Sequence, residues 1–195
     1  MKTVLIIILL CRIAYAQPCD ALTGTASQGT IEYTLNPFKN RTHAPTSSQI
    51  VNTITLDKIL QTGNDLNRFH NSEGAVIEGY VISTKLSDKE SCNCDMTAPK
   101  FRDIHLMIAK NANETDKAKM MVIEITPKIR ATKPTAWSPA NISKLVGHKI
   151  KITGWMMFDT VHKNVARNTA ASSTTSYQRA TCWEVHPVTH IVTIN

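Results

Sequence analysis

Hydrophobic and polar residues alternate in five short runs along the second half of the chain. The runs cover residues 74–86, 103–109, 120–127, 148–158 and 179–194. Alternation of this kind places apolar side chains on one face of a β-strand and polar side chains on the other. The pattern therefore predicts five strands, each with one face in a core.

One short helix is predicted between the third and fourth strands, from Ser138 to Val146. Ser138 is a typical N-cap, Pro139 would occupy the first helical position, and Gly147 follows the predicted end. The order β-β-β-α-β-β is that of a small five-stranded OB-like barrel. Such barrels bind oligonucleotides or oligosaccharides on strands 2 and 3 and the adjoining loops. We therefore predict a mainly β domain over residues 74–195.

Residues 17–73 are predicted to form an irregular N-terminal extension that packs on the barrel or is tethered to it. Thr, Ser, Asn and Pro are frequent between residues 17 and 50. A short helix is expected over residues 55–62, where Leu56, Ile59 and Leu60 follow helical spacing after the candidate N-cap Thr55.

Residues 1–16 have the pattern of a signal peptide. Lys2 precedes the apolar run 4–10, and Ala14-Tyr15-Ala16 supplies a small-x-small cleavage site. The apolar run is well short of the ~20 residues that span a bilayer. We predict a secreted or periplasmic protein that is cleaved near Ala16, with no transmembrane segment in the mature chain.

The mature chain is predicted to be mildly basic. Without Lys2 and Arg12 it would carry 20 basic against 15 acidic residues, a net charge of +5. This charge suits an anionic partner such as nucleic acid, a phosphorylated glycan or a membrane surface, and it equally suits ordinary solubility, which we favour. The candidate residues for an anionic ligand are Arg102, Lys128, Arg130 and Arg179.

Four cysteines remain in the predicted mature chain: Cys19, Cys92, Cys94 and Cys182. Export exposes them to oxidising conditions, and their even number permits two disulfides. A direct Cys92–Cys94 bridge would be strained, so we expect Cys92 or Cys94 to pair with Cys19 or Cys182. A metal site built on Cys-x-Cys is the alternative, although the spacing lacks the usual two-residue gap.

Polar residues of three strands are predicted to share one face of the barrel. In an OB-like barrel the third strand lies between the second and the fifth. If the Ile and Leu positions face the core, the outward face carries Asp103, His105, Glu124, Glu184 and His186. Imidazoles and carboxylates on strands ~4.8 Å apart could bind Zn²⁺ or Mn²⁺ or supply a general base. The competing interpretation is an ordinary solvated sheet face, and a register slip of one residue would invert the placement.

The sequence leaves the activity open. It contains no Gly-x-Ser-x-Gly, no His-Glu-x-x-His and no phosphate-binding Gly-rich loop. The leading hypothesis is a module that binds an oligomeric or anionic ligand, an oligonucleotide or an oligosaccharide, on the strand 2–3 face and the two long loops at 85–102 and 159–178. A metal-dependent hydrolase and a structural envelope protein are the alternatives, so whether the protein is an enzyme stays undecided.

Several segments resemble those of an uncharacterised group of exported bacterial proteins with an OB-like barrel. The resemblance covers most of the predicted mature chain and implies a bacterial envelope or secreted setting, without an activity. In that group a His follows soon after the second Cys of the Cys-Asn-Cys run, whereas this chain has Asp95, so the resemblance does not support a metal site that uses that loop. The similar segments are residues 35–41, 63–65, 90–94, 102–105, 124–127 and 183–189.

Overall fold

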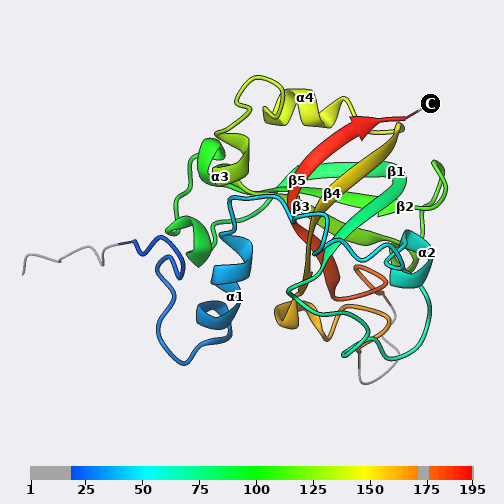
Figure 1. The fold of residues 1–195 in the computed structure, drawn as a ribbon, viewed down its shortest axis with the longest axis horizontal. Coiled ribbons are helices and arrows are strands. Elements are labelled where there is room, and N and C mark those ends of the chain that lie inside the picture. The colour runs from blue at the N-terminus through cyan, green and yellow to red at the C-terminus, as the bar shows by residue number, and fades with distance from the viewer. Residues whose placement is uncertain (1–18, 171–175, 195) are drawn as a thin grey trace, which may run out of the picture.

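Five strands form a closed barrel in the computed structural model, which describes residues 19–170 and 176–194 (Figure 1). The predicted signal peptide therefore lies outside the described residues. The strands are β1 (Gly74–Leu86), β2 (Ile104–Ala109), β3 (Met121–Ile125), β4 (Lys149–Phe158) and β5 (Trp183–Thr193). All five lie inside the runs that the alternation predicted.

The strand order around the barrel is β1-β2-β3-β5-β4, and β4 pairs with β1 to close it. Every pairing is antiparallel except that between β3 and β5, which is parallel. The mainly β, OB-like prediction is confirmed, including the position of the third strand between the second and the fifth.

Apolar side chains of all five strands fill the barrel. In β2 the predicted core positions Ile104, Leu106 and Ile108 are at most 2 % exposed. Strand β3 is buried along its whole length on both faces, with Val122 and Glu124 covered as well as Ile123. The outer surface of the sheet at β3 is therefore not solvated, and a second layer lies over it.

Two short helices join β3 to β4. Helix α3 (Pro127–Arg130) begins directly after β3, with the Thr126 hydroxyl as its N-cap. Helix α4 (Pro139–Ser143) is the predicted helix, and the Ser138 hydroxyl accepts a hydrogen bond from the backbone N–H of Asn141. It is shorter than predicted because turns with i→i+3 bonds replace the α-helical pattern after it.

The N-terminal extension is more ordered than predicted. Residues Ile31–Lys39 form the nine-residue helix α1, capped by the Thr30 hydroxyl. Its apolar pattern is weak because its two buried residues are Leu35 and Asn36, and Pro37 lies inside it. A buried polar residue and an internal proline do not indicate a helix, so hydrophobic periodicity did not predict α1. The expected helix after Thr55 is present as α2 (Leu56–Ile59).

The long loop between β1 and β2, residues 87–103, packs with α1 over the outer face of the barrel. It contains the 3₁₀ turns η1 (Ser91–Asn93) and η2 (Pro99–Phe101), while η3 (Lys117–Lys119) precedes β3 and η4 (Thr160–His162) follows β4. The buried Asn36 side chain of α1 donates to Ser91 Oγ over 3.0 Å, and Lys39 Nζ lies 2.8 Å from Glu90 Oε2. We call residues 87–102 together with α1 the cover.

A disulfide ties the start of the described chain to the cover. It joins Cys19 to Cys94, with Cα atoms 5.5 Å apart, and so confirms one of the predicted pairings. Cys92 and Cys182 are buried free thiols, so the described residues hold no second bridge. None of the helices in the described ranges is long and apolar enough to cross a membrane.

Strand β5 bends beside Gly154 of β4. The pairing of the two strands shifts register on both sides of Gly154. A Cβ atom at this position would lie 2.4 Å from the carbonyl oxygen of Pro187 and 2.5 Å from Val185 Cγ1. The absence of a side chain thus lets β5 cross closely at the residues next to His186.

Candidate metal centre

The five polar residues predicted to share a face do converge. His105 of β2 pairs with Glu124 of β3, and the parallel pair Ile123–Val185 brings Glu184 and His186 of β5 alongside. Asp103 directly precedes β2. The inferred register was therefore right, and it places imidazoles and carboxylates from three adjacent strands together.

This cluster is buried, so the competing interpretation of an ordinary solvated sheet face is wrong. Asp103 and His186 are 0 % exposed, Glu184 is 1 % exposed and Glu124 3 %. The cover lies over the cluster, and two of its polar side chains bind Asp103 directly. Asn93 Nδ2 donates to Asp103 Oδ1 over 2.9 Å, and Ser87 Oγ accepts from the Asp103 backbone N–H over 3.1 Å.

Glu124 lies between the two histidines. Its Oε1 is 3.2 Å from His105 Nε2, and its Oε2 is 3.2 Å from His186 Nδ1. His186 also has Glu184 Oε2 3.3 Å from Nδ1 and Asp103 Oδ2 3.6 Å from Nε2. One carboxylate thus presents each of its oxygens to a different imidazole.

Four atoms of the cluster have no hydrogen-bond partner among the described residues: Asp103 Oδ2, His105 Nε2, Glu124 Oε2 and His186 Nε2. A buried polar atom without a partner costs about 1–3 kcal/mol, so such atoms are rare in native proteins and need an explanation. Here they gather at one place. Asp103, Glu124 and His186 each offer a ligand atom within 4.8 Å of the others, as do Glu90, His105 and Glu124.

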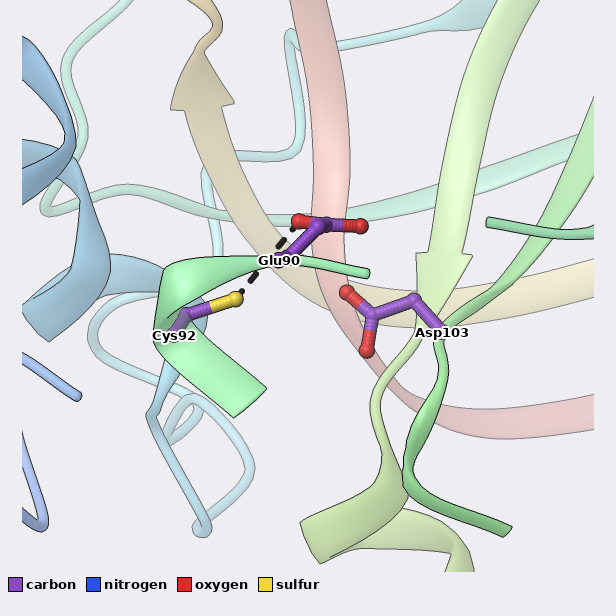
Figure 2. Close-up of side chains that lie close together, drawn as sticks. All are labelled: Glu90, Cys92 and Asp103. Atoms are coloured by element: carbon purple, nitrogen blue, oxygen red, sulfur yellow. Dashed lines mark hydrogen bonds between the residues drawn. The ribbon is translucent and has the colours of Figure 1, made fainter. Parts of the chain in front are cut away.

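Glu90 and Cys92 belong to the same cluster, and sequence reasoning did not place them there. Figure 2 shows Glu90 and Cys92 on one segment of the chain and Asp103 on another, with the three side chains close together, and these residues form another candidate ligand set. Cys92 Sγ lies 3.5 Å from Glu90 Oε2. The sequence made Cys92 a candidate for a disulfide or for a Cys-x-Cys metal site, and Glu90 lies in an irregular loop without periodicity. The one available signal was that loops beside strands 2 and 3 of such barrels hold ligands.

The carboxylates of the cluster differ strongly in their proton affinity. Burial raises the pKa of Asp103 to about 7, and the negative charge of Glu90 acts in the same direction. Burial also opposes ionisation of Glu90, yet His105 and Lys39 hold the pKa of Glu90 at about 2. Glu124 keeps a pKa well below its ordinary value because two histidines outweigh its burial.

The histidines respond to the same charges. Burial lowers the pKa of His105, but the carboxylate of Glu124 outweighs it and holds that pKa at about 10. His186 likewise has a raised pKa, because Glu124 and Glu184 outweigh the effect of its burial. Without another cation nearby, both imidazoles therefore carry protons.

The charges of the cluster do not balance without an added cation or these protons. Two permanent cations face the carboxylates: Lys39 contacts Glu90, and Arg179 contacts both Glu184 and Asp159. If all five carboxylates are ionised, three negative charges remain in excess, and because burial raises the pKa of Asp103 and of Glu184, a proton on either carboxylate reduces this excess. Protons on both histidines offset two of them, and a single divalent cation would offset the same two. The carboxylates are Glu90, Asp103, Glu124, Asp159 and Glu184.

Two clefts reach the cluster from solvent. The larger has a volume of about 460 Å³, and its lining includes Lys39, Glu90, His105 and His162. A smaller one of about 220 Å³ also meets His105. The His105 side chain is 15 % exposed. A small molecule in either cleft would contact His105 before the buried residues behind it.

The four basic residues predicted for an anionic ligand serve mainly internal contacts. Arg179 is 5 % exposed and forms ion pairs with Glu184 and Asp159. Arg102 Nε donates to the Ser87 carbonyl, and Lys128 Nζ donates to the Ala21 carbonyl over 2.6 Å. Arg130 donates to carbonyls of the cover. None of the four lies on an open strand 2–3 face, because the cover occupies that face.

Roughly half of the chain is similar to a known protein family. Residues 62–158 match the family model of a domain of unknown function, DUF6359. The matched region contains β1 to β4 together with Glu90, Asp103, His105 and Glu124, whereas α1 and β5 lie outside it. This match is consistent with the resemblance to an uncharacterised group and supplies no activity. A comparison with curated proteins gave no match.

Proposed function

We propose that the protein binds a divalent metal ion, Zn²⁺ or Mn²⁺, through Asp103, Glu124 and His186, and uses it to hydrolyse a small substrate. One observation carries the proposal. Each of these three residues is at least 97 % buried, and each has a ligand atom without a hydrogen-bond partner. One ligand atom of each residue lies within 4.8 Å of the others, so an ion at this point could contact all three residues.

The donor set suits the proposed ions. Imidazole nitrogen and carboxylate oxygen are ligands of catalytic Zn²⁺ sites, and carboxylates also suit Mn²⁺. Glu124 directs its second oxygen towards His105, and Glu90 lies 3.8 Å from that histidine. A second ion at His105 and Glu90 would therefore share Glu124 with the first.

Access from the clefts through His105 and Glu90 favours a catalytic role, although Asp103, Glu124 and His186 do not themselves line either cleft. Structural Zn²⁺ sites are closed, whereas catalytic sites keep a position open to water and substrate. A bound divalent ion lowers the pKa of a coordinated water and so provides a nucleophile near neutral pH. His105, on the cleft side of Glu124, is placed to carry a proton between such a water and the cleft.

Binding of an oligonucleotide or oligosaccharide along strands 2 and 3 is less well supported. The outer face of β2, β3 and β5 carries the cover, which the Cys19–Cys94 disulfide and the Lys39–Glu90 ion pair hold in place. A polymer on this face would have to displace buried contacts. A structural envelope protein would explain the barrel but not the orphaned ligand atoms.

Metal analysis combined with thermal unfolding tests the proposal. Protein purified from its native compartment should contain Zn or Mn. EDTA should lower the melting temperature and added Zn²⁺ should restore it, because a ligand of the folded state stabilises it. His186→Ala should abolish the response, and His105→Ala should remove only the part due to a second ion. His190→Ala, at an exposed histidine of the same strand, should retain the full response.

Two other results would reject the metal centre. If EDTA has no effect and the His105→Ala variant loses capture of an oligonucleotide or oligosaccharide, the face binds a polymer. If the variants fold and the protein shows neither a melting-temperature response to metal nor capture of a polymer, the cluster is a buried ion-pair network and the barrel has a structural role.

We also propose that the protein is exported, with residues 1–16 removed and Gln17 as the mature start. The disulfide between Cys19 and Cys94 supports an oxidising compartment. The intact mass of exported protein should correspond to loss of residues 1–16. Recovery of the full-length chain in a membrane fraction would contradict the proposal.

A further inference from the structure

A separate, largely apolar groove lies between the cover and the segment that contains α3 and α4. Its volume is about 940 Å³. The Cys19–Cys94 disulfide forms part of its wall. Most of its surface comes from apolar side chains: Met96, Pro99, Phe101, Pro127, Pro134 and Trp137. A pocket of this size and lining is typical of sites for small, mostly apolar ligands.

The charged residues of the groove are all basic. Lys100, Lys128 and Arg130 line it, and no acidic residue of the described chain does. Lys100 Nζ lies 4.8 Å from the centre of the Phe101 ring, and Lys133 Nζ lies 4.5 Å from the centre of the Trp137 ring. The groove thus combines an apolar lining with charged side chains that are all positive.

Arg130 shows where a negative group would bind. It is 7 % exposed, and its Nη2 donates to the carbonyls of Pro99 and Lys100 over 3.2 and 3.1 Å. Its buried Nε has no hydrogen-bond partner, and Arg130 forms no ion pair with a carboxylate of the described residues, although the more distant charge of Asp103 acts on it. Burying a guanidinium without a counter-ion is costly, so an anion from outside the chain would complete this site.

We infer that the groove binds a free long-chain carboxylate, that is, a fatty acid. The hydrocarbon chain lies against Met96, Phe101 and Trp137, and the carboxylate pairs with Arg130. The apolar lining suits a hydrocarbon chain, and the unpartnered donor of Arg130 suits a single negatively charged head group. A nucleic acid or a glycan would need a series of polar contacts that this lining lacks. The three proposed metal ligands Asp103, Glu124 and His186 do not line the groove, although Cys92 and Asn93, which lie beside the cluster, do.

Calorimetric titration with dodecanoate below its micellar concentration tests the inference. The full mature protein is used in excess EDTA, so the result does not depend on the metal centre. One equivalent of dodecanoate should bind. Butanoate, which has the same head group and a short chain, should bind at least tenfold more weakly, and so should dodecyltrimethylammonium, which has the same chain and the opposite charge.

Two variants locate the binding site. Met96 is 41 % exposed in the groove wall, and Met96→Glu should weaken dodecanoate binding at least tenfold. Leu66→Glu is the matched control: Leu66 is 43 % exposed outside the groove, and its substitution should leave binding unchanged. Arg130→Gln should weaken dodecanoate binding while that of dodecyltrimethylammonium stays the same. If Arg130→Gln does not fold, Met96→Glu decides.

Several outcomes would overturn the inference. Absence of dodecanoate binding, equal binding of the anionic and cationic amphiphiles, or unchanged binding by Met96→Glu would each do so. Adsorption to vesicles of anionic phospholipid without binding of dissolved dodecanoate would instead make the groove a membrane-contact surface, and the fatty-acid assignment would be wrong.

Discussion

Glu124 Oε2 and His186 Nδ1 lie 3.2 Å apart in the buried cluster, yet Glu124 Oε2 forms no hydrogen bond. The other nitrogen of His186, Nε2, also has no partner, although Asp103 Oδ2 is 3.6 Å away. Two atoms that bind the same ion also lie close together without forming a hydrogen bond to each other. The same atoms form a charged network when protons replace the ion, so metal and protons compete for the cluster.

Glu124→Gln should remove the metal response with little change in shape. The amide has the size of the carboxylate but carries no charge, so Zn²⁺ affinity should fall at least tenfold in a calorimetric titration. In the metal-free protein, the pKa of His105 should fall from about 10 towards its ordinary value of 6.5, because Glu124 is the main cause of the shift. Titration of the His105 ring by NMR measures this. An unchanged pKa would show that another group holds the proton.

Stability of the metal-free protein should fall as the pH rises from 6.5 to 10. The folded protein binds the His105 proton with a pKa of about 10 and the unfolded chain with about 6.5. This stabilisation is therefore complete below pH 6.5 and is lost as the pH rises through 10. We expect a loss of ~1 kcal/mol or more in the free energy of unfolding, since each pKa unit corresponds to about 1.4 kcal/mol.

Urea denaturation in EDTA at both pH values checks this. His105→Gln should reduce the difference between them, and His148→Gln, at an exposed position, should not. If the free energy of unfolding changes equally between the two pH values in the wild type and in His105→Gln, the proton is not on His105.

Loss of the disulfide should destabilise the protein by about 2–4 kcal/mol, because Cys19 and Cys94 are 75 residues apart and the bond restricts the unfolded chain. Cys19→Ser and Cys94→Ser should each show this loss in urea denaturation. The double variant should lose no more than either single one, since both remove the same bond. Peptide mapping without reductant should find Cys19 linked to Cys94, with Cys92 and Cys182 free. Additive losses would refute the pairing.

Gly154→Ala should lower the free energy of unfolding by about 1–3 kcal/mol, the usual cost of forcing an extra group into a packed region. The added methyl would collide with the Pro187 carbonyl and the Val185 side chain. Because β5 would have to shift beside His186, Zn²⁺ affinity should fall as well. Ser83→Ala, at an exposed position of β1, is the strand control and should change neither. A stable variant with normal Zn²⁺ affinity would show that β5 adjusts freely here.

Much of the barrel could be predicted from local patterns. Alternation in β2 and β3 identified Ile104, Leu106 and Ile123 as core positions, because side chains along a strand point alternately to its two faces. The strand order then followed from the number and spacing of elements. With that order, His105, Glu124 and His186 could be placed on one face before any contact was known.

The cover could not be predicted in this way. Helix α1 buries Asn36 rather than a regular apolar stripe, and residues 87–102 show no regular alternation of apolar and polar positions. Their positions depend on contacts between segments far apart in the chain, such as Asn36 with Ser91 and Cys19 with Cys94. No pattern along the sequence records such pairings.

The sequence by itself determined which residues lie on the polar face, since strand periodicity is a local property. Only the tertiary structure decided that this face is buried, that Glu90 and Cys92 join it, and that Arg179 is bound by Glu184 instead of facing a ligand. Burial is a property of the whole fold: a carboxylate has the same neighbours in sequence whether water or a helix covers it. Removal of water is what shifts the pKa of Asp103 to about 7 and leaves ligand atoms unpartnered.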